Sequence, residues 1–171
     1  MELYDTPGYE RSNMVMCTRP GTGASDTTQA AMRWMATGEI TTPRNPAFSA
    51  YGTGLTNQTS EGNYGSWTEN FDRGGNYVGG TTNVFTAPVD GLYFFYAHTN
   101  FNSGSSSPYY WRAIKNNGGI GIFYGSGNEG WEHINATILV QLDKNDTFEW
   151  KYKGDPDEGA EWAQLGGYLV G

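Results

Sequence analysis

Residues 131–153 alternate between apolar and polar side chains with a period of two, and no other feature of the chain constrains its fold as strongly. Between residues 131 and 142, the apolar positions are Ile134, Ala136, Ile138, Val140 and Leu142. Between residues 147 and 153, aromatic side chains alternate with charged ones, and residues 143–146 have the composition of a tight turn. Because successive side chains of a strand point to opposite faces, the pattern predicts a hairpin of two strands, each with one buried face.

Short strands separated by turn residues are expected throughout residues 46–171. The chain has 171 residues, of which 25 are glycine, 15% are aromatic and only 16% are charged, a composition that favours strands and turns over helices. Eight or nine strands without a convincing helix predict an all-β sandwich or jelly roll. Residues 1–45 lack a clean strand pattern, and residues 27–35 could form two helical turns. We expect this segment to be an arm that a partner or a neighbouring subunit orders.

The charge and the apolar content of the chain argue against several classes of partner. A formal net charge of −8 provides no basic patch for a phosphate backbone. No apolar run approaches the roughly 20 residues of a membrane-spanning helix. The single cysteine, Cys17, cannot form a disulfide within the chain, and the first residues show no signal-peptide pattern. We therefore expect neither a nucleic acid nor a membrane as partner.

One expected strand is apolar on both faces. Leu92, Phe94 and Tyr96 fall on one face, while Tyr93 and Phe95 fall on the other. A strand of a sandwich has only one face in the core, so something else has to cover the second. Another subunit is the most economical cover.

Five sequence blocks, all in the same order, resemble the C1q domain of the C1q/TNF superfamily. They are Pro-Ala-Phe-Ser-Ala at 46–50, Phe-Thr-Ala-Pro-Val-Asp-Gly-Leu-Tyr-Phe-Phe at 85–95, Ile-Lys-Asn-Asn-Gly at 114–118, Leu-Val-Gln-Leu-Asp-Lys-Asn-Asp-Thr-Phe at 139–148, and Leu-Gly-Gly-Tyr-Leu at 165–169. The resemblance covers about residues 45–171 and implies a ten-strand jelly roll that forms compact homotrimers. It implies a trimer interface at Leu92, Phe94 and Tyr96, near the threefold axis. Asn145 and Ala97 depart from the family pattern, which has a glycine and usually an aromatic residue there.

Residues 37–48, Thr-Gly-Glu-Ile-Thr-Thr-Pro-Arg-Asn-Pro-Ala-Phe, are similar to the lead-in of C1q-like domains in bacteriophage virion proteins. This similarity implies a virion structural protein, assembled in the host cytoplasm and placed on the capsid surface. We expect a non-enzymatic, trimeric capsid decoration or cement protein whose residues 1–45 bind the major capsid protein or other virion proteins. The short chain has no fibrous shaft, which favours cement over fibre. The alternatives are a receptor-binding knob of a tail fibre or spike that binds host-surface glycans, and a secreted C1q-type recognition module.

Few residues suggest chemistry. Asp155, Asp157 and Glu158 could hold calcium, since they offer hard oxygen ligands in a Gly/Pro turn and some C1q-family members bind calcium at the trimer apex. Tyr109, Tyr110 and Trp111 follow a Ser-rich loop and are candidates for a glycan surface.

The two histidines offer no catalytic site. His98 and His133 lie on different expected strands, without the further ligands or the nucleophile that a metal site or a triad needs. If they met in a buried interface, trimer stability would change near pH 6.

Overall fold

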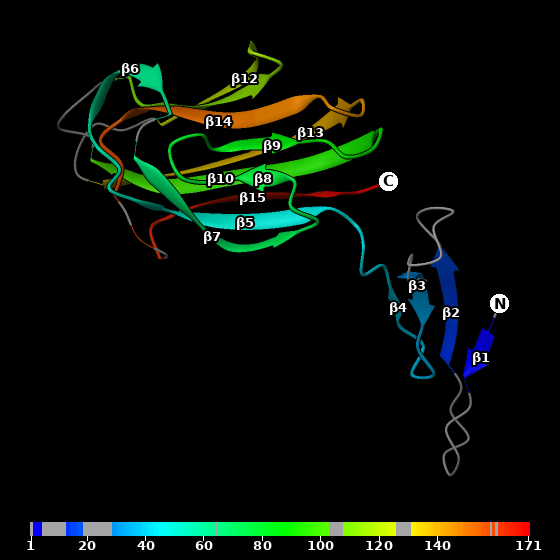
Figure 1. The fold of residues 1–171 in the computed structure, drawn as a ribbon. Coiled ribbons are helices and arrows are strands. Elements are labelled where there is room, and N and C mark those ends of the chain that lie inside the picture. Colours follow the sequence, from blue (N-terminus) through cyan, green and yellow to red (C-terminus); the bar gives the residue numbers. More distant parts are fainter. Residues whose placement is uncertain are drawn as a thin grey trace. The chain divides into compact units, whose positions relative to one another are not determined.

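A computed structural model describes residues 2–4, 13–18, 29–63, 65–102, 108–125, 131–157, 159 and 161–171 (Figure 1). Its contacts divide the chain into two compact units, Met1–Asn45 and Pro46–Gly171. No helix in the described ranges is long and apolar enough to cross a membrane.

The first unit contains a four-stranded antiparallel sheet. Its strands, in spatial order, are β1 (Glu2–Tyr4), β2 (Asn13–Thr18), β3 (Gln29–Trp34) and β4 (Ile40–Thr41). The expectation of helical turns in residues 27–35 is therefore wrong for β3. Met32 and Trp34 stand opposite Met16 and Met14 of β2, and this cross-strand pairing overrides a weak helical preference.

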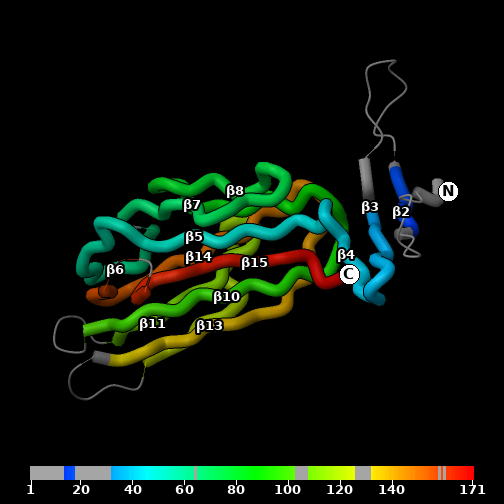
Figure 2. The backbone as a smooth tube through the Cα atoms, turned by 90° about the horizontal axis from the view of Figure 1, so that it is seen from below, coloured from blue at the N-terminus to red at the C-terminus, as the bar shows by residue number. Residues whose placement is uncertain are grey.

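The second unit is a jelly roll of two antiparallel sheets. The first sheet has the order β13 (Trp131–Leu142), β10 (Gly91–Asn102), β15 (Ala163–Leu169), β5 (Ala47–Thr53) and β7 (Ser66–Arg73) (Figure 2). The second has the order β12 (Gly118–Tyr124), β11 (Tyr110–Lys115), β14 (Thr147–Gly154), β9 (Val84–Thr86) and β8 (Tyr77–Val78). A short additional strand, β6 (Gln58–Gly62), pairs with β14. The predicted all-β jelly roll is thus confirmed, and the described residues of this unit form eleven strands rather than ten, because β6 adds to the two five-stranded ladders.

The predicted hairpin at residues 131–153 is wrong, although both of its strands exist. β13 pairs with β10 along all of its twelve residues, whereas β14 pairs with β11 and β9 in the other sheet. Residues 143–146 therefore carry the chain from one sheet to the other. A period-two pattern cannot separate the two arrangements, because each strand turns one face to the core in either case.

Stacked aromatic rings fill the space between the sheets. Phe95 of the first sheet and Phe148 of the second lie nearly parallel, with ring centroids 3.7 Å apart. The other large aromatic side chains that are fully buried are Trp67, Trp111, Trp150, Tyr93, Tyr109, Tyr152, Phe85 and Phe101. Burial of such large rings is the main source of stability in a small β-domain with few charges.

Candidate functional site

The two faces of β10 have different environments. Tyr93 and Phe95 are completely buried between the sheets. Leu92, Phe94 and Tyr96 point the other way, onto the outer face of the first sheet, where they are half-buried within the chain. The alternation predicted from the sequence is thus present in the fold, with Tyr93 and Phe95 on its core side.

Apolar side chains from neighbouring strands extend this outer face. Phe94 stands between Leu139 of β13 and Tyr168 of β15, and its ring centroid lies 5.4 Å from that of Tyr168. Leu139 is 57% exposed and Tyr168 is 47% exposed. Phe71 of β7 is also exposed. The apolar outer face is defined here as Leu92, Phe94, Tyr96, Leu139, Tyr168 and Phe71. Figure 2 looks onto the sheet that carries it.

A glycine keeps this face flat beside Tyr96. A Cβ atom at Gly166 would lie 2.8 Å from the Tyr96 ring and 2.6 Å from the Phe48 carbonyl oxygen. The Tyr96 ring therefore lies over the bare backbone of β15, and its hydroxyl donates a hydrogen bond to Ser49 Oγ at 3.2 Å. The absence of a side chain on Gly166 lets an aromatic ring lie down across the strand.

Both histidines lie on the polar continuation of the same outer face. His98 of β10 stands opposite Asn135 of β13 and Gln164 of β15. His133 stands opposite Asn100, one step further along β10 on the same face. Burial lowers the pKa of His98, and the nearby His133 lowers it further. The structure thus brings together two histidines that lie far apart in the sequence.

The four-stranded sheet of the first unit also has one apolar face, which the sequence pattern did not reveal. Register places Met14 opposite Trp34, and Trp34 opposite Ile40; Met16 stands opposite Met32 in the next row. Directly opposed residues share a face. Within the described residues of this face, Met16, Met32, Trp34 and Ile40 are exposed. The arm face is defined as Met14, Met16, Met32, Trp34 and Ile40.

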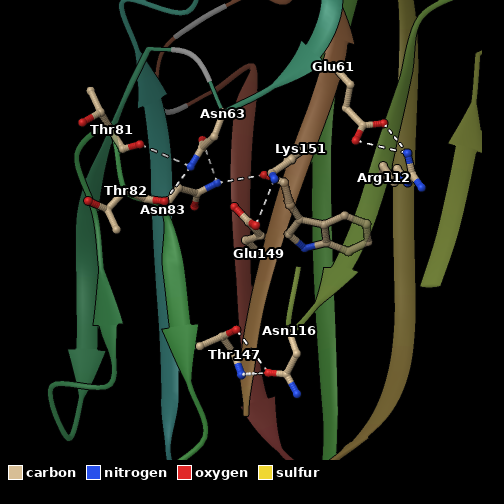
Figure 3. Close-up of polar contacts among 11 residues, drawn as sticks. Glu61, Asn63, Thr81, Thr82, Asn83, Arg112, Asn116, Thr147, Glu149 and Lys151 are labelled. Carbon is tan, nitrogen blue, oxygen red and sulfur yellow. Dashed lines mark hydrogen bonds and ion pairs between the residues drawn. The ribbon is translucent and has the colours of Figure 1, made fainter. Parts of the chain in front are cut away.

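Ion pairs lie on the outer face of the second sheet, between side chains of β6, β11 and β14 (Figure 3). Glu61 of β6 accepts two hydrogen bonds from Arg112 Nη1, at 2.9 and 3.2 Å, and a third from the Tyr110 hydroxyl at 3.3 Å. Lys151 and Glu149 form a second ion pair at 3.1 Å. Burial raises the pKa of Tyr110, and the Glu61 carboxylate raises it further.

Asparagines join the loops to this sheet. Asn63 donates to the Thr82 carbonyl oxygen at 2.6 Å (Figure 3). Asn83, which is buried with a φ of 49°, donates to Asn63 Oδ1 at 3.2 Å and to the Trp150 carbonyl oxygen at 3.0 Å. The Tyr77 hydroxyl donates to Asn83 Oδ1 at 2.7 Å. Asparagine tolerates this left-handed backbone and satisfies several buried polar groups, so the network has a structural role.

Asp146 anchors the turn between β13 and β14. Its carboxylate accepts hydrogen bonds from Lys115 Nζ at 2.8 Å, Asn116 Nδ2 at 2.7 Å and the Asp143 backbone amide at 2.9 Å. These partners, Lys115 first, lower the pKa of Asp146 to about 2. Asn116 Oδ1 in turn accepts from the Thr147 backbone amide at 2.8 Å (Figure 3).

The glycan surface predicted at Tyr109, Tyr110 and Trp111 is wrong for two of its three residues. Tyr109 is 2% exposed and Trp111 is fully buried, so both belong to the core. Only Tyr110 points outward, where its ring meets that of Tyr124 edge to face with centroids 5.3 Å apart. Alternation along β11 is the physical reason, because it sends the first and third residues of the run inward.

The described residues of the acidic turn give no complete set of metal ligands. Asp155 and Asp157 are tied to β10 through their backbones, by bonds from Asn102 N to Asp155 O and from Asp157 N to Asn100 O. Glu158 lies outside the described residues. Within the described ranges, no three His, Cys, Asp or Glu side chains are close enough together to hold a metal ion. Calcium binding at this turn stays a prediction.

Known structures share this fold at low sequence identity. No family model matches the chain, and no curated protein sequence matches it. A crystal structure of murine APRIL at pH 5.0 superposes with a TM-score of 0.61 at 12% identity, covering 74% of this chain and 99% of that one. The globular domain of zebrafish complement 1qA protein superposes with a TM-score of 0.57 at 18% identity, covering 74% and 98%. The predicted C1q/TNF-like jelly roll is thus confirmed as a fold.

Proposed function

We propose that the chain is a non-enzymatic homotrimer that decorates a bacteriophage capsid, with residues 1–45 attached to the shell. The arm face carries the attachment part of this proposal. It is an apolar face of a separately folded sheet, and Met16, Met32, Trp34 and Ile40 are exposed on it. Exposed apolar surface of this kind marks an interaction site in a soluble protein. The phage context rests on the similarity of residues 37–48 to virion proteins.

The apolar outer face supports the trimer. Phe94, Leu139 and Tyr168 form a continuous apolar strip across three strands. A second copy of the chain would cover it, and the resemblance to the C1q/TNF superfamily implies that three copies do so. Tyr96 and its bond to Ser49 extend the strip with a preformed flat surface, and such a surface loses little side-chain entropy on association.

Binding to capsids tests the attachment. Trp34 is 50% exposed. If the capsid covers this exposed half of its ~200 Å² of side-chain surface, the burial contributes about 2.5 kcal/mol to binding, or roughly 70-fold in affinity. Trp34→Glu in the full chain removes this burial and adds a charge to the arm face. The matched control is Thr41→Glu, since Thr41 stands opposite Arg33, away from the arm face.

The assay is co-sedimentation with heads stripped of accessory proteins, combined with mass determination by light scattering. The wild type and Thr41→Glu should bind as trimers in saturable numbers, and Trp34→Glu should remain trimeric but lose binding. Equal loss in both variants would contradict the role of the arm face. Wild-type trimers that do not bind heads but do bind host cells would instead support the alternative function of a receptor-binding knob.

A further inference from the structure

Three strands of the second sheet place two tyrosines and a lysine in one row of its outer face. Tyr110 of β11 stands opposite Tyr124 of β12 on one side and Lys153 of β14 on the other. Their inward neighbours, Trp111 and Tyr152, are buried, which confirms that this row points away from the core. We call Tyr124, Tyr110 and Lys153 the tyrosine–lysine row.

The row presents an aromatic ring in a fixed orientation. Tyr124 is 61% exposed, the largest value among the described large hydrophobic side chains. The edge-to-face contact with Tyr110 supports its ring from one side. Tyr110 is in turn held by its hydrogen bond to Glu61 at 3.3 Å. An aromatic ring that is both exposed and braced is preorganised for stacking with a ligand.

Some of the cationic side chains around the row have an ion-pair partner, and one has none within the described residues. In the adjacent row, Arg112 is paired with Glu61 and Lys151 with Glu149. Lys153 forms no ion pair within the described part of the chain. Among the described cationic side chains of this surface, its ammonium group is therefore available to a negatively charged group, in a protein whose net charge is −8.

We propose that the tyrosine–lysine row binds a carboxylated oligosaccharide, with a sugar ring stacked on Tyr124 and the carboxylate paired with Lys153. The negative face of an aromatic ring attracts the polarised C–H bonds of a sugar. The neighbouring ion pairs offer further donors and acceptors to sugar hydroxyls. A purely apolar partner would have to desolvate Lys153 and both ion pairs, which disfavours it. This site is independent of the proposed trimer and of capsid attachment.

Titration calorimetry with the full chain tests the site. The probes are sialyllactose, trigalacturonic acid and a hyaluronan hexasaccharide, each compared with its carboxyl-reduced form. At least one acidic probe should bind, and its reduced form should bind about tenfold more weakly. Tyr124→Ala should weaken binding by about tenfold or more, whereas Tyr124→Phe, which keeps the ring, should retain it. Lys153→Gln should remove the preference for the acid, and Lys144→Gln, a lysine on the β13–β14 turn, should not.

Each of three results would overturn the proposal. In the first, none of the acidic probes binds at ~10 mM, the weak end of saccharide affinities. In the second, acidic and reduced probes bind equally. In the third, Tyr124→Ala binds as the wild type does while its thermal unfolding is unchanged. Because Tyr124 is exposed and lies outside the core, its replacement leaves the fold intact, and unchanged unfolding verifies this.

Discussion

Replacing Tyr168 with alanine should weaken the trimer without unfolding the subunit. Tyr168 is 47% exposed on the apolar outer face. About half of its ~200 Å² is then available for burial by another subunit, which contributes about 2.3 kcal/mol at ~25 cal/mol per Å². Three copies contribute about 7 kcal/mol per trimer, or about five powers of ten in the association constant.

The concentration at which trimers half-dissociate varies as the inverse square root of this association constant, so a loss of about five powers of ten should raise it about 300-fold. Sedimentation equilibrium over a dilution series measures it. Tyr124→Ala is the matched control, because Tyr124 is equally aromatic and more exposed but lies on the second sheet. An unchanged midpoint for Tyr168→Ala, or an equal shift for Tyr124→Ala, would refute the assignment of the apolar outer face as the interface.

Four further predictions concern the subunit. Phe95→Ala should reduce the free energy of unfolding by about 3–5 kcal/mol in urea, because it empties the centre of the aromatic core; a loss under 1 kcal/mol would contradict that packing. Gly167→Ala should cost about 1–3 kcal/mol in the same assay, since its Cβ would lie 2.3 Å from the Phe95 ring. Asp146, whose pKa is lowered to about 2, should stabilise the fold above pH 4 and lose this effect as the pH falls towards 2. In Asp146→Asn, the urea concentration at the unfolding midpoint should therefore depend less on pH between about 4 and 2. The lowered pKa of His98 means that the folded state disfavours its protonation, so the free energy of unfolding should fall as the pH drops below about 6.5. Both His98→Gln and His133→Gln should reduce that fall, because burial and the nearby His133 are the causes of the lowered pKa.

The sequence predicted those features that depend on side-chain period. The two faces of β10 follow from alternation alone, and so does the burial of Ile134 and Leu142 on β13. The same rule, applied to residues 109–111, would have separated outward Tyr110 from its buried neighbours. The three aromatic residues therefore do not form one surface.

Features that depend on the exact register between strands were beyond the sequence. Tyr124 becomes the neighbour of Tyr110 only through the register of β11 with β12, which includes a bulge after Ala113. The arm face likewise depends on the register of β2 with β3. A single chain does not reveal which strand pairs with which, because strands with one apolar face are interchangeable in pattern.

The pairing of β5 with β15 also bears on the order in which the strands of the first sheet can assemble. Residues 47–51 hydrogen-bond with residues 164–168, and β15 lies between β5 and β10 in the first sheet. We therefore expect β5 and β10 to join one continuous sheet only after residues 163–169 have been synthesised. Contacts of such long sequence separation fold slowly. Because β15 contributes Leu165 to the core and Tyr168 to the apolar outer face, we expect both to be completed only when this strand is inserted.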